Sequence, residues 1–421
     1  MALFRNLGSL SKLTGAISSK LGAVPVPTGF SRPIAIDFGC GSLKVLQIGD
    51  QNPPTLIAAA CLETPRELMN DVAKRLAFQV AALPKLIRHG GFRGKRAVCA
   101  IPAWQMLCKQ LQVPRQDNVP LASLVEAALP TQLNVDPASV VYRYEEIAGA
   151  GGSGKSDLIV IATPRDLVER LMRALQHAKL EPVGMQTEFT AILRAFDHVH
   201  RREGDLQVST LYIDIGAGTT KVAISHGTNL AFARIIQAGG MQMDETLAAQ
   251  LKCEPDEARR RRLATGATLP AEPKAAPVPV AAAPAGGGTA TAEQPERRGA
   301  NALPGFGPDI LSQPASSVAP ENGDLTESLE ILTDEISMCL RYHAGQFPGR
   351  KVERAVFIGG EARHRGLCQQ IARRLRLPAQ MADPMARVAR TGNEPALGVD
   401  LKQPQPGWAV ALGLCLCQTD L

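Results

Sequence analysis

Residues 34–45 read IAIDFGCGSLKV, and residues 211–222 read LYIDIGAGTTKV. Each stretch is an apolar strand ending in aspartate, followed by a glycine-bearing turn with a hydroxyl residue and by a second strand. Both stretches therefore predict a β-hairpin. Because glycine has no Cβ, backbone N–H groups at such a tip approach an anion closely. Internal duplication indicates duplicated structure, so the repeat predicts two hairpins that grip one polyphosphate from both sides.

The two copies share the residue types that such a grip requires. The hydroxyl groups add hydrogen bonds, and the aspartates are placed to hold a hydrated Mg²⁺, which keeps most of its waters and prefers oxygen ligands. We assign Asp37 and Asp214 to this metal through water, and no residue to catalysis. The candidate nucleotide-binding residues of the hairpins are Asp37, Gly39, Gly41, Ser42, Lys44, Asp214, Gly216, Gly218, Thr219, Thr220 and Lys221.

A strand, a diglycine and a helix come later in the chain. Residues 356–358 end a buried strand, Gly359 and Gly360 make a tight turn, and a helix starts near Arg365. Such a diglycine lets a flat ring lie against the backbone and brings a helix N-terminus near the ligand. Placed after two phosphate-type hairpins, Gly359, Gly360 and Glu361 are therefore candidates for contacting the adenosine.

Residues 149–156, GAGGSGKS, fit the P-loop formula but lack its context. A P-loop follows a buried strand and opens a helix, whose N-terminal N–H groups hold the phosphates. Here the preceding VVYRYEEIA alternates like a half-exposed strand, and the next segment, DLIVIATP, is itself a strand. We interpret the stretch as a flexible hairpin loop with Lys155 in solvent.

Composition narrows the function classes. With 421 residues, the chain is long enough for two to three domains. Its net charge of +6 is compatible with work near an anionic membrane surface but too diffuse to indicate nucleic acid, and aromatic residues make up only 4%. Nine cysteines without a CxxC pair favour a reduced, cytoplasmic protein.

Two segments differ from the rest. Residues 1–30 space apolar and basic residues as an amphipathic helix would, which is compatible either with membrane-surface contact or with a basic end that docks nowhere. Residues 264–322 are rich in Ala, Pro and Gly and predict a disordered linker.

The order of hairpin, helix-bearing middle, second hairpin and strand–diglycine–helix resembles the actin/Hsp70/sugar-kinase superfamily, across about residues 31–264 and 323–417. Within it, the chain is similar to the PilM family, cytoplasmic actin-like proteins of the type IV pilus inner-membrane platform that themselves resemble FtsA. The stretches that carry this resemblance are residues 97–114, 158–196, 232–240 and 407–416.

The resemblance implies an α/β, actin-like (ribonuclease H-like) two-lobed ATPase fold with ATP and Mg²⁺ in the cleft, an inserted FtsA-like α+β subdomain and the disordered linker. It also implies that Glu257, on the helix after the second hairpin, contacts the ribose; Arg261 stands where a lysine is common. The expected division is 1–30 N-terminal segment, 31–96 first lobe, 97–164 inserted subdomain, 165–205 first lobe, 206–263 second lobe, 264–322 linker and 323–421 second lobe.

The family's partner is the N-terminal cytoplasmic tail of a PilN-like inner-membrane protein, bound in a groove of the first lobe, with pilus motor ATPases as further candidates. The resemblance implies an ATP-binding scaffold, cytoplasmic and peripherally associated with the inner membrane, and no nucleic acid. The alternative is a small-molecule, sugar-type kinase. A kinase needs an acid and a polar substrate pocket, and residues 90–98 show no sugar-reading cluster, so we expect slow hydrolysis at most.

Overall fold

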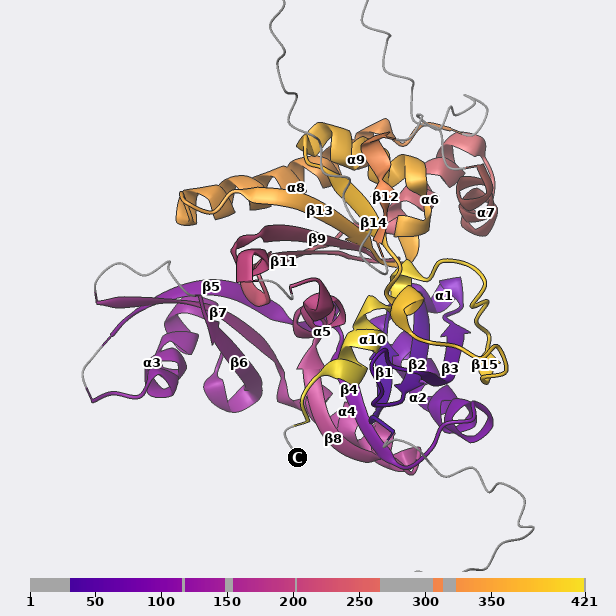
Figure 1. Ribbon diagram of the computed structural model, residues 1–421, viewed down its shortest axis with the longest axis horizontal. Helices are drawn as coiled ribbons and strands as arrows, with labels where there is room; N and C mark the ends of the chain where they lie inside the picture. The colour runs from indigo at the N-terminus through magenta and orange to yellow at the C-terminus, as the bar shows by residue number, and fades with distance from the viewer. Residues whose placement is uncertain are drawn as a thin grey trace, which may run out of the picture.

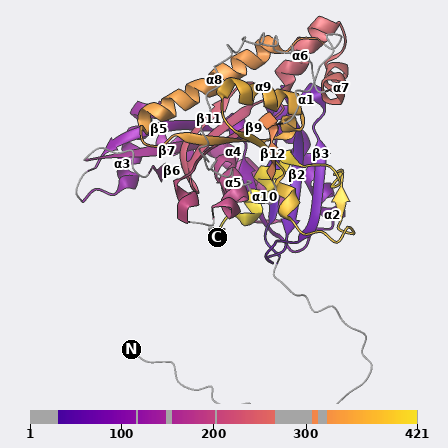
Figure 2. The same cartoon turned by 45° about the horizontal axis from the view of Figure 1, so that its top comes forward.

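The computed structural model describes residues 31–115, 118–147, 154–200, 203–265, 306–312 and 323–419. These residues form two six-stranded sheets and a three-stranded sheet. The two large sheets belong to two lobes, and the small sheet extends to one side of them (Figures 1 and 2). The segment predicted at residues 1–30 and most of the predicted linker lie outside the described residues.

The first-lobe sheet begins with the first copy of the repeat. Strand β1 pairs antiparallel with β2 and parallel with β4, so the hairpin sits in the middle of the sheet. Its strand order is β15 (Ala396–Leu397), β3 (Leu56–Glu63), β2 (Ser42–Ile48), β1 (Ile34–Phe38), β4 (Arg96–Ile101) and β8 (Glu181–Thr187).

The second-lobe sheet repeats this topology around the second hairpin. Strand β9 pairs antiparallel with β10 and parallel with β13, as β1 does with β2 and β4. The strand order is β11 (Asn229–Ile236), β10 (Thr220–His226), β9 (Ser209–Ile215), β13 (Val352–Ile358), β14 (Ala379–Ala382) and β12 (Phe306–Asp309). The predicted duplication is therefore present in three dimensions.

Helices cover the sheets in three layers. The leucines of α2 (Val72–His89) and α4 (Arg165–His177) pack on one face of the first-lobe sheet. Between the lobes lie α5 (Glu188–Phe196) and α10 (Ala409–Leu416), in a core shared by both sheets. The second-lobe sheet packs against α6 (Gly240–Leu251), α7 (Pro255–Thr265), α8 (Thr326–Gln346) and α9 (Arg365–Leu375).

The C-terminal segment does not stay in the second lobe. The sequence assigned residues 323–421 to that lobe, with the apolar helix packed on its sheet; this part of the prediction is wrong. Strand β15 pairs with β3 of the first-lobe sheet, and α10 packs against α5 and that sheet. A Cβ on Gly413 would lie 1.7 Å from the carbonyl oxygen of Ala191, so glycine is what allows α10 and α5 to cross this closely.

The small sheet has the order β5 (Leu107–Pro114), β7 (Lys155–Pro164) and β6 (Val140–Glu146), and α3 (Leu121–Ala128) packs on it. Its central strand starts at Lys155, so the P-loop-like sequence leads into a strand and not a helix, which excludes a P-loop there. The Lys155 side chain donates to Gln112 Oε1 at 3.2 Å. Residues 148–153 lie outside the described residues.

Part of the predicted linker is ordered. Residues 264 and 265 continue α7, and β12 pairs antiparallel with β14 inside the range 264–322. The Phe306 side chain is 8% exposed and packs against the core between the lobes, which supplies the apolar burial that the composition of the linker as a whole does not indicate. Among the described residues, no helix is both long and apolar enough to cross a membrane.

Candidate nucleotide-binding cleft

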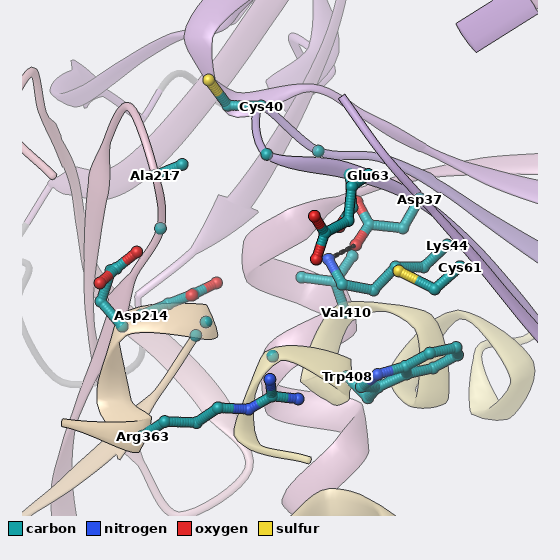
Figure 3. Close-up of a pocket in the computed structure, with 18 of the residues that line it drawn as sticks. Asp37, Cys40, Lys44, Cys61, Glu63, Asp214, Ala217, Arg363, Trp408 and Val410 are labelled. Atoms are coloured by element: carbon teal, nitrogen blue, oxygen red, sulfur yellow. Dashed lines mark hydrogen bonds and ion pairs between the residues drawn. The ribbon is translucent and has the colours of Figure 1, made fainter. Parts of the chain in front are cut away.

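The two hairpin tips face each other across a cavity of about 290 Å³ between the lobes. Asp37 and Asp214 stand on opposite sides of it, each at the end of its hairpin's first strand, and Arg363 and Trp408 lie along a third side (Figure 3). Both aspartates are nearly buried, at 4% and 5% exposed. The duplicated sequence therefore produces one shared cleft.

Each aspartate is paired with the lysine of its own hairpin. Asp37 is the cross-strand neighbour of Lys44, and Asp214 is that of Lys221, in the same register. The ammonium nitrogen lies 3.3 Å from Asp37 Oδ2 in the first hairpin and 2.8 Å from Asp214 Oδ2 in the second. Burial alone would lower the pKa of Lys44, but Asp37 offsets this and raises it.

Lys221 also forms an ion pair across the two lobes with Glu188. Thr187 ends β8 and caps α5 by accepting from the N–H of Thr190 at 3.0 Å, which places Glu188 in the first turn on the cleft floor. Its other carboxylate oxygen accepts from the N–H of Ala103 at 2.6 Å.

Asp214, Glu188 and Lys221 form a charge cluster of two carboxylates and one ammonium group. Burial alone would lower the pKa of Lys221, but Asp214 and Glu188 outweigh it and raise the pKa well above its ordinary value. Burial raises the pKa of Glu188, and Lys221 opposes this shift. Lys221 is therefore fully charged, and its charge offsets the cost of burying the two carboxylates.

The tips themselves touch. A Cβ on Gly218 would lie 2.9 Å from Cys40 Sγ, and one on Gly41 would lie 3.1 Å from the Cβ of Ala217. Gly359, at φ +94°, is a second place where only glycine suits the backbone, since a Cβ there would lie 2.3 Å from the carbonyl oxygen of Ile215. The diglycine turn thereby packs directly on the end of β9.

A chain of ion pairs connects this turn to the other lobe. Arg262, whose side chain is 0% exposed, binds Glu361 Oε2 at 2.5 Å and Asp244 Oδ1 at 2.8 Å. Asp244 Oδ2 accepts in addition from Arg66 at 2.9 Å. Arg66 belongs to α1 (Arg66–Met69) of the first lobe, so the network runs from the diglycine turn of the second lobe to the first lobe.

Most of the residues predicted from sequence meet in this cavity. Two do not line it. The Thr220 side chain is buried and donates to the carbonyl oxygen of Ala238, and the Glu257 carboxylate pairs with Arg261 on the exposed side of α7. The residues that line the cavity are Asp37, Gly39, Gly41, Ser42, Lys44, Asp214, Gly216, Gly218, Thr219, Lys221, Gly359, Gly360 and Glu361.

Sequence reasoning missed several lining residues, among them Glu188, Arg259, Arg363 and Trp408. For Glu188 a signal exists, since it is the one acid in the mostly apolar stretch TEFTAILRAF, at the end of a strand. Arg259 is one of four successive arginines, and the pattern does not distinguish which faces the cleft. Trp408 enters with the C-terminal segment, whose placement the sequence does not reveal.

The donor set does not form a ready-made magnesium site. Lysine ammonium groups already engage Asp37 and Asp214, and among the described residues no cluster of three His, Cys, Asp or Glu side chains is arranged to hold a metal ion. These carboxylates are suited to contact through water with an ion that arrives on the nucleotide. Water-mediated Mg²⁺ at Asp37 and Asp214 stays a prediction.

Comparison with known proteins shows which families the chain resembles. It matches the family model of the type IV pilus assembly protein PilM over residues 35–274 and that of the cell division protein FtsA over residues 211–413. No curated protein matches it in sequence.

Among solved structures, a PilM–PilN type IV pilus biogenesis complex superposes with a TM-score of 0.67 at 20% identity, covering 91% of this chain and 98% of that chain. The ethanolamine utilization protein EutJ from Carboxydothermus hydrogenoformans gives 0.46 at 14% identity, covering 93% and 91%. MreB5 of Spiroplasma citri bound to ADP gives 0.41 at 13% identity, covering 90% and 94%. The predicted actin-like fold is confirmed. Since the PilM model matches more than half of the chain, the chain belongs to the PilM family of type IV pilus assembly proteins.

Proposed function

We propose that this protein binds ATP in the cleft between its lobes and serves as a cytoplasmic scaffold of type IV pilus assembly that carries the tail of a PilN-like inner-membrane protein. One observation carries the nucleotide part: two hairpin tips of matching sequence pattern, with Asp–Lys pairs in the same register, face one cavity. Backbone N–H groups and lysines approaching from two sides are suited to a polyphosphate.

The geometry favours binding over turnover. A general base must be free to accept a proton. The buried carboxylate of Glu188 is engaged by Lys221 and by the N–H of Ala103, and lysines likewise engage Asp37 and Asp214. Nucleotide would then act as a structural switch. We expect phosphate release slower than about one per second, below the usual range of enzymes.

Isothermal titration of the purified protein with MgATP tests the nucleotide part. Asp214→Asn should weaken binding at least about 100-fold, because an uncharged amide neither forms an ion pair with Lys221 nor attracts a hydrated cation, and each factor of ten corresponds to about 1.4 kcal/mol. Asp166→Asn is the matched control, since Asp166 is an exposed aspartate on α4 outside the cavity lining, and its affinity should stay within about threefold. Wild-type protein that binds no ATP refutes the proposal, and equal losses in both variants refute the role of Asp214.

A groove between the small sheet and the first lobe suits the tail. Strands β6 and β8 are edge strands of their sheets. Between them lies a mostly apolar cavity of about 260 Å³, with Met106, Met172 and Met185 in its lining. An edge strand offers unpaired backbone groups to an extended peptide, and methionine side chains adapt to varied apolar partners. The PilM–PilN complex among the similar structures supports a tail of this kind as the occupant.

Fluorescence polarisation with a synthetic peptide of the cognate PilN-like N-terminal tail tests this groove. Met172→Glu should weaken binding at least about tenfold, because it places an unpaired carboxylate against apolar surface. Met338→Glu is the matched control: Met338 is 39% exposed against 37% for Met172, but lies on α8 outside the groove. If both variants bind like the wild type, the tail binds elsewhere.

A further inference from the structure

The last turns of α2, the loop that follows and the first residue of β4 carry a cluster of positive charge without counter-charges. Residues 85–96 read KLIRHGGFRGKR and contain no acidic residue. All five of their lysines and arginines are exposed, and none has an ion-pair partner in the described part of the chain. We call this segment the basic loop. Its cationic residues are Lys85, Arg88, Arg93, Lys95 and Arg96.

The basic loop differs from the rest of the first lobe in gathering five such cations within twelve residues. Elsewhere on this lobe, Lys74 pairs with Asp71 at 3.1 Å and Arg170 with Asp166 at 3.1 Å, whereas the exposed Lys179 stands apart from the cluster and pairs with no carboxylate that the structure describes. The acid nearest the loop by strand register is Glu181, opposite Arg96, but the two form no ion pair. The charge of the loop is therefore available to an outside partner.

The fold holds the basic loop in a fixed shape. Gln47 is 1% exposed; its Nε2 donates to the carbonyl oxygen of Arg93 at 2.7 Å, and its Oε1 accepts from the N–H of Arg93 at 2.7 Å. The Phe92 ring packs into the first-lobe core, and the carbonyl oxygen of Lys95 accepts from the N–H of Glu181 at 2.8 Å. Preorganised charges lose little entropy on binding.

The described chain begins beside this loop. Gln47 Nε2 also donates to the carbonyl oxygen of Arg32 at 3.2 Å, so the start of the described chain lies beside the loop. The first-lobe elements β1 and α2 lie away from α8 and α9 (Figure 1). The 30 residues before this point contain Arg5, Lys12 and Lys20 and no acid. The sequence that precedes the described chain is therefore apolar and basic as well.

We propose that the basic loop binds the surface of a bilayer that contains anionic phospholipid. Clustered lysines and arginines are attracted to such a surface, each by about fivefold in partitioning. Single-stranded nucleic acid is the less suitable partner, because its binding needs exposed aromatic platforms, and the loop's one aromatic residue, Phe92, packs inward. The proposed bilayer-binding surface is distinct from the nucleotide cleft and from the groove proposed for the PilN-like tail.

Cosedimentation of the full chain with phosphatidylcholine vesicles containing about 30% phosphatidylglycerol tests the proposal. The variant Arg88→Gln/Arg93→Gln/Lys95→Gln should lower the partition coefficient about 100-fold at low salt, and binding of the wild type should decline as salt is added. The matched control is Lys74→Gln/Arg170→Gln/Arg173→Gln, which removes the same charge from ion-paired positions on the same lobe. It should stay within about threefold of the wild type.

The outcomes separate the alternatives. Equal binding of both triple variants to the vesicles overturns the proposal, as does wild-type binding that is no stronger than to pure phosphatidylcholine. Binding of a fluorescent oligonucleotide that depends on the loop, without vesicle binding, assigns the loop to nucleic acid instead. The assay contains neither ATP nor a partner protein, so its failure leaves the proposed scaffold function standing. Matching melting temperatures of the three proteins show that every variant is folded.

Discussion

Replacing Lys221 by methionine is expected to lower the free energy of unfolding by about 3–5 kcal/mol, the usual cost of removing one partner from a buried ion pair. The ammonium group of Lys221 is the counter-charge for both Asp214 and Glu188, whose side chains are 7% and 6% exposed. Methionine fills similar space but leaves two carboxylates close together in a poorly solvated site. Urea unfolding at pH 8 measures the difference.

The loss should depend on pH in a defined direction. Burial already raises the pKa of Glu188, and without the ammonium group it rises further. The folded variant then binds more protons than the unfolded chain between about pH 4.3, the ordinary glutamate pKa, and the raised value. Its stability therefore falls as pH rises through this window, and the deficit at pH 5 should be smaller than at pH 8.

Lys44→Met is the matched control for Lys221→Met. Lys44 occupies the same position in the first hairpin, but it pairs with one carboxylate, at 3.3 Å, and its side chain is 17% exposed. Its replacement should cost less, about 1–3 kcal/mol. Equal losses of stability for the two lysine variants would contradict the role of Lys221 as the counter-charge of both carboxylates. A Lys221→Met deficit that is the same at pH 5 and pH 8 would contradict it as well.

Arg262→Met is expected to destabilise the protein to a similar extent, about 3–5 kcal/mol. The substitution leaves the Glu361 carboxylate without an ion-pair partner among the described residues. It also removes one of the two arginines that pair with Asp244. Because Glu361 belongs to the diglycine turn, MgATP affinity should fall as well. Unfolding in urea and isothermal titration measure the two effects.

The neighbouring arginine supplies the control. Arg261 pairs with Glu257 on the surface of α7, where the two side chains are 44% and 41% exposed. Exposed pairs of this kind contribute about 0–1 kcal/mol, so Arg261→Met should leave stability and affinity nearly unchanged. If the two substitutions prove equally harmful, the network from Arg262 through Asp244 to Arg66 does not connect the lobes energetically.

Much of the cleft is predictable because its signals are local. The aspartate ends a strand, and the lysine lies across the hairpin from it, so their pairing results from the turn alone. The P-loop interpretation of residues 149–156 is likewise excluded by a local signal, since strand β7 begins at Lys155 where a P-loop requires a helix. The role of Glu257 rests on a different kind of signal. The resemblance alone implies its ribose contact, which stays a prediction, and in the structure its carboxylate pairs with Arg261.

By itself, the sequence determined the duplicated hairpins and the diglycine turn, because strand periodicity and turn chemistry act over a few residues. The actin-like fold was implied by the family resemblance that these motifs and their order carry. Only the tertiary structure decided where α10 packs, that Glu188 completes the charge cluster around Lys221, and that Arg262 rather than Arg261 is buried. A helix such as α10, apolar over nearly its whole surface, suits either lobe equally well in sequence. Its position depends on a long-range fit, Gly413 against Ala191, which no local pattern records.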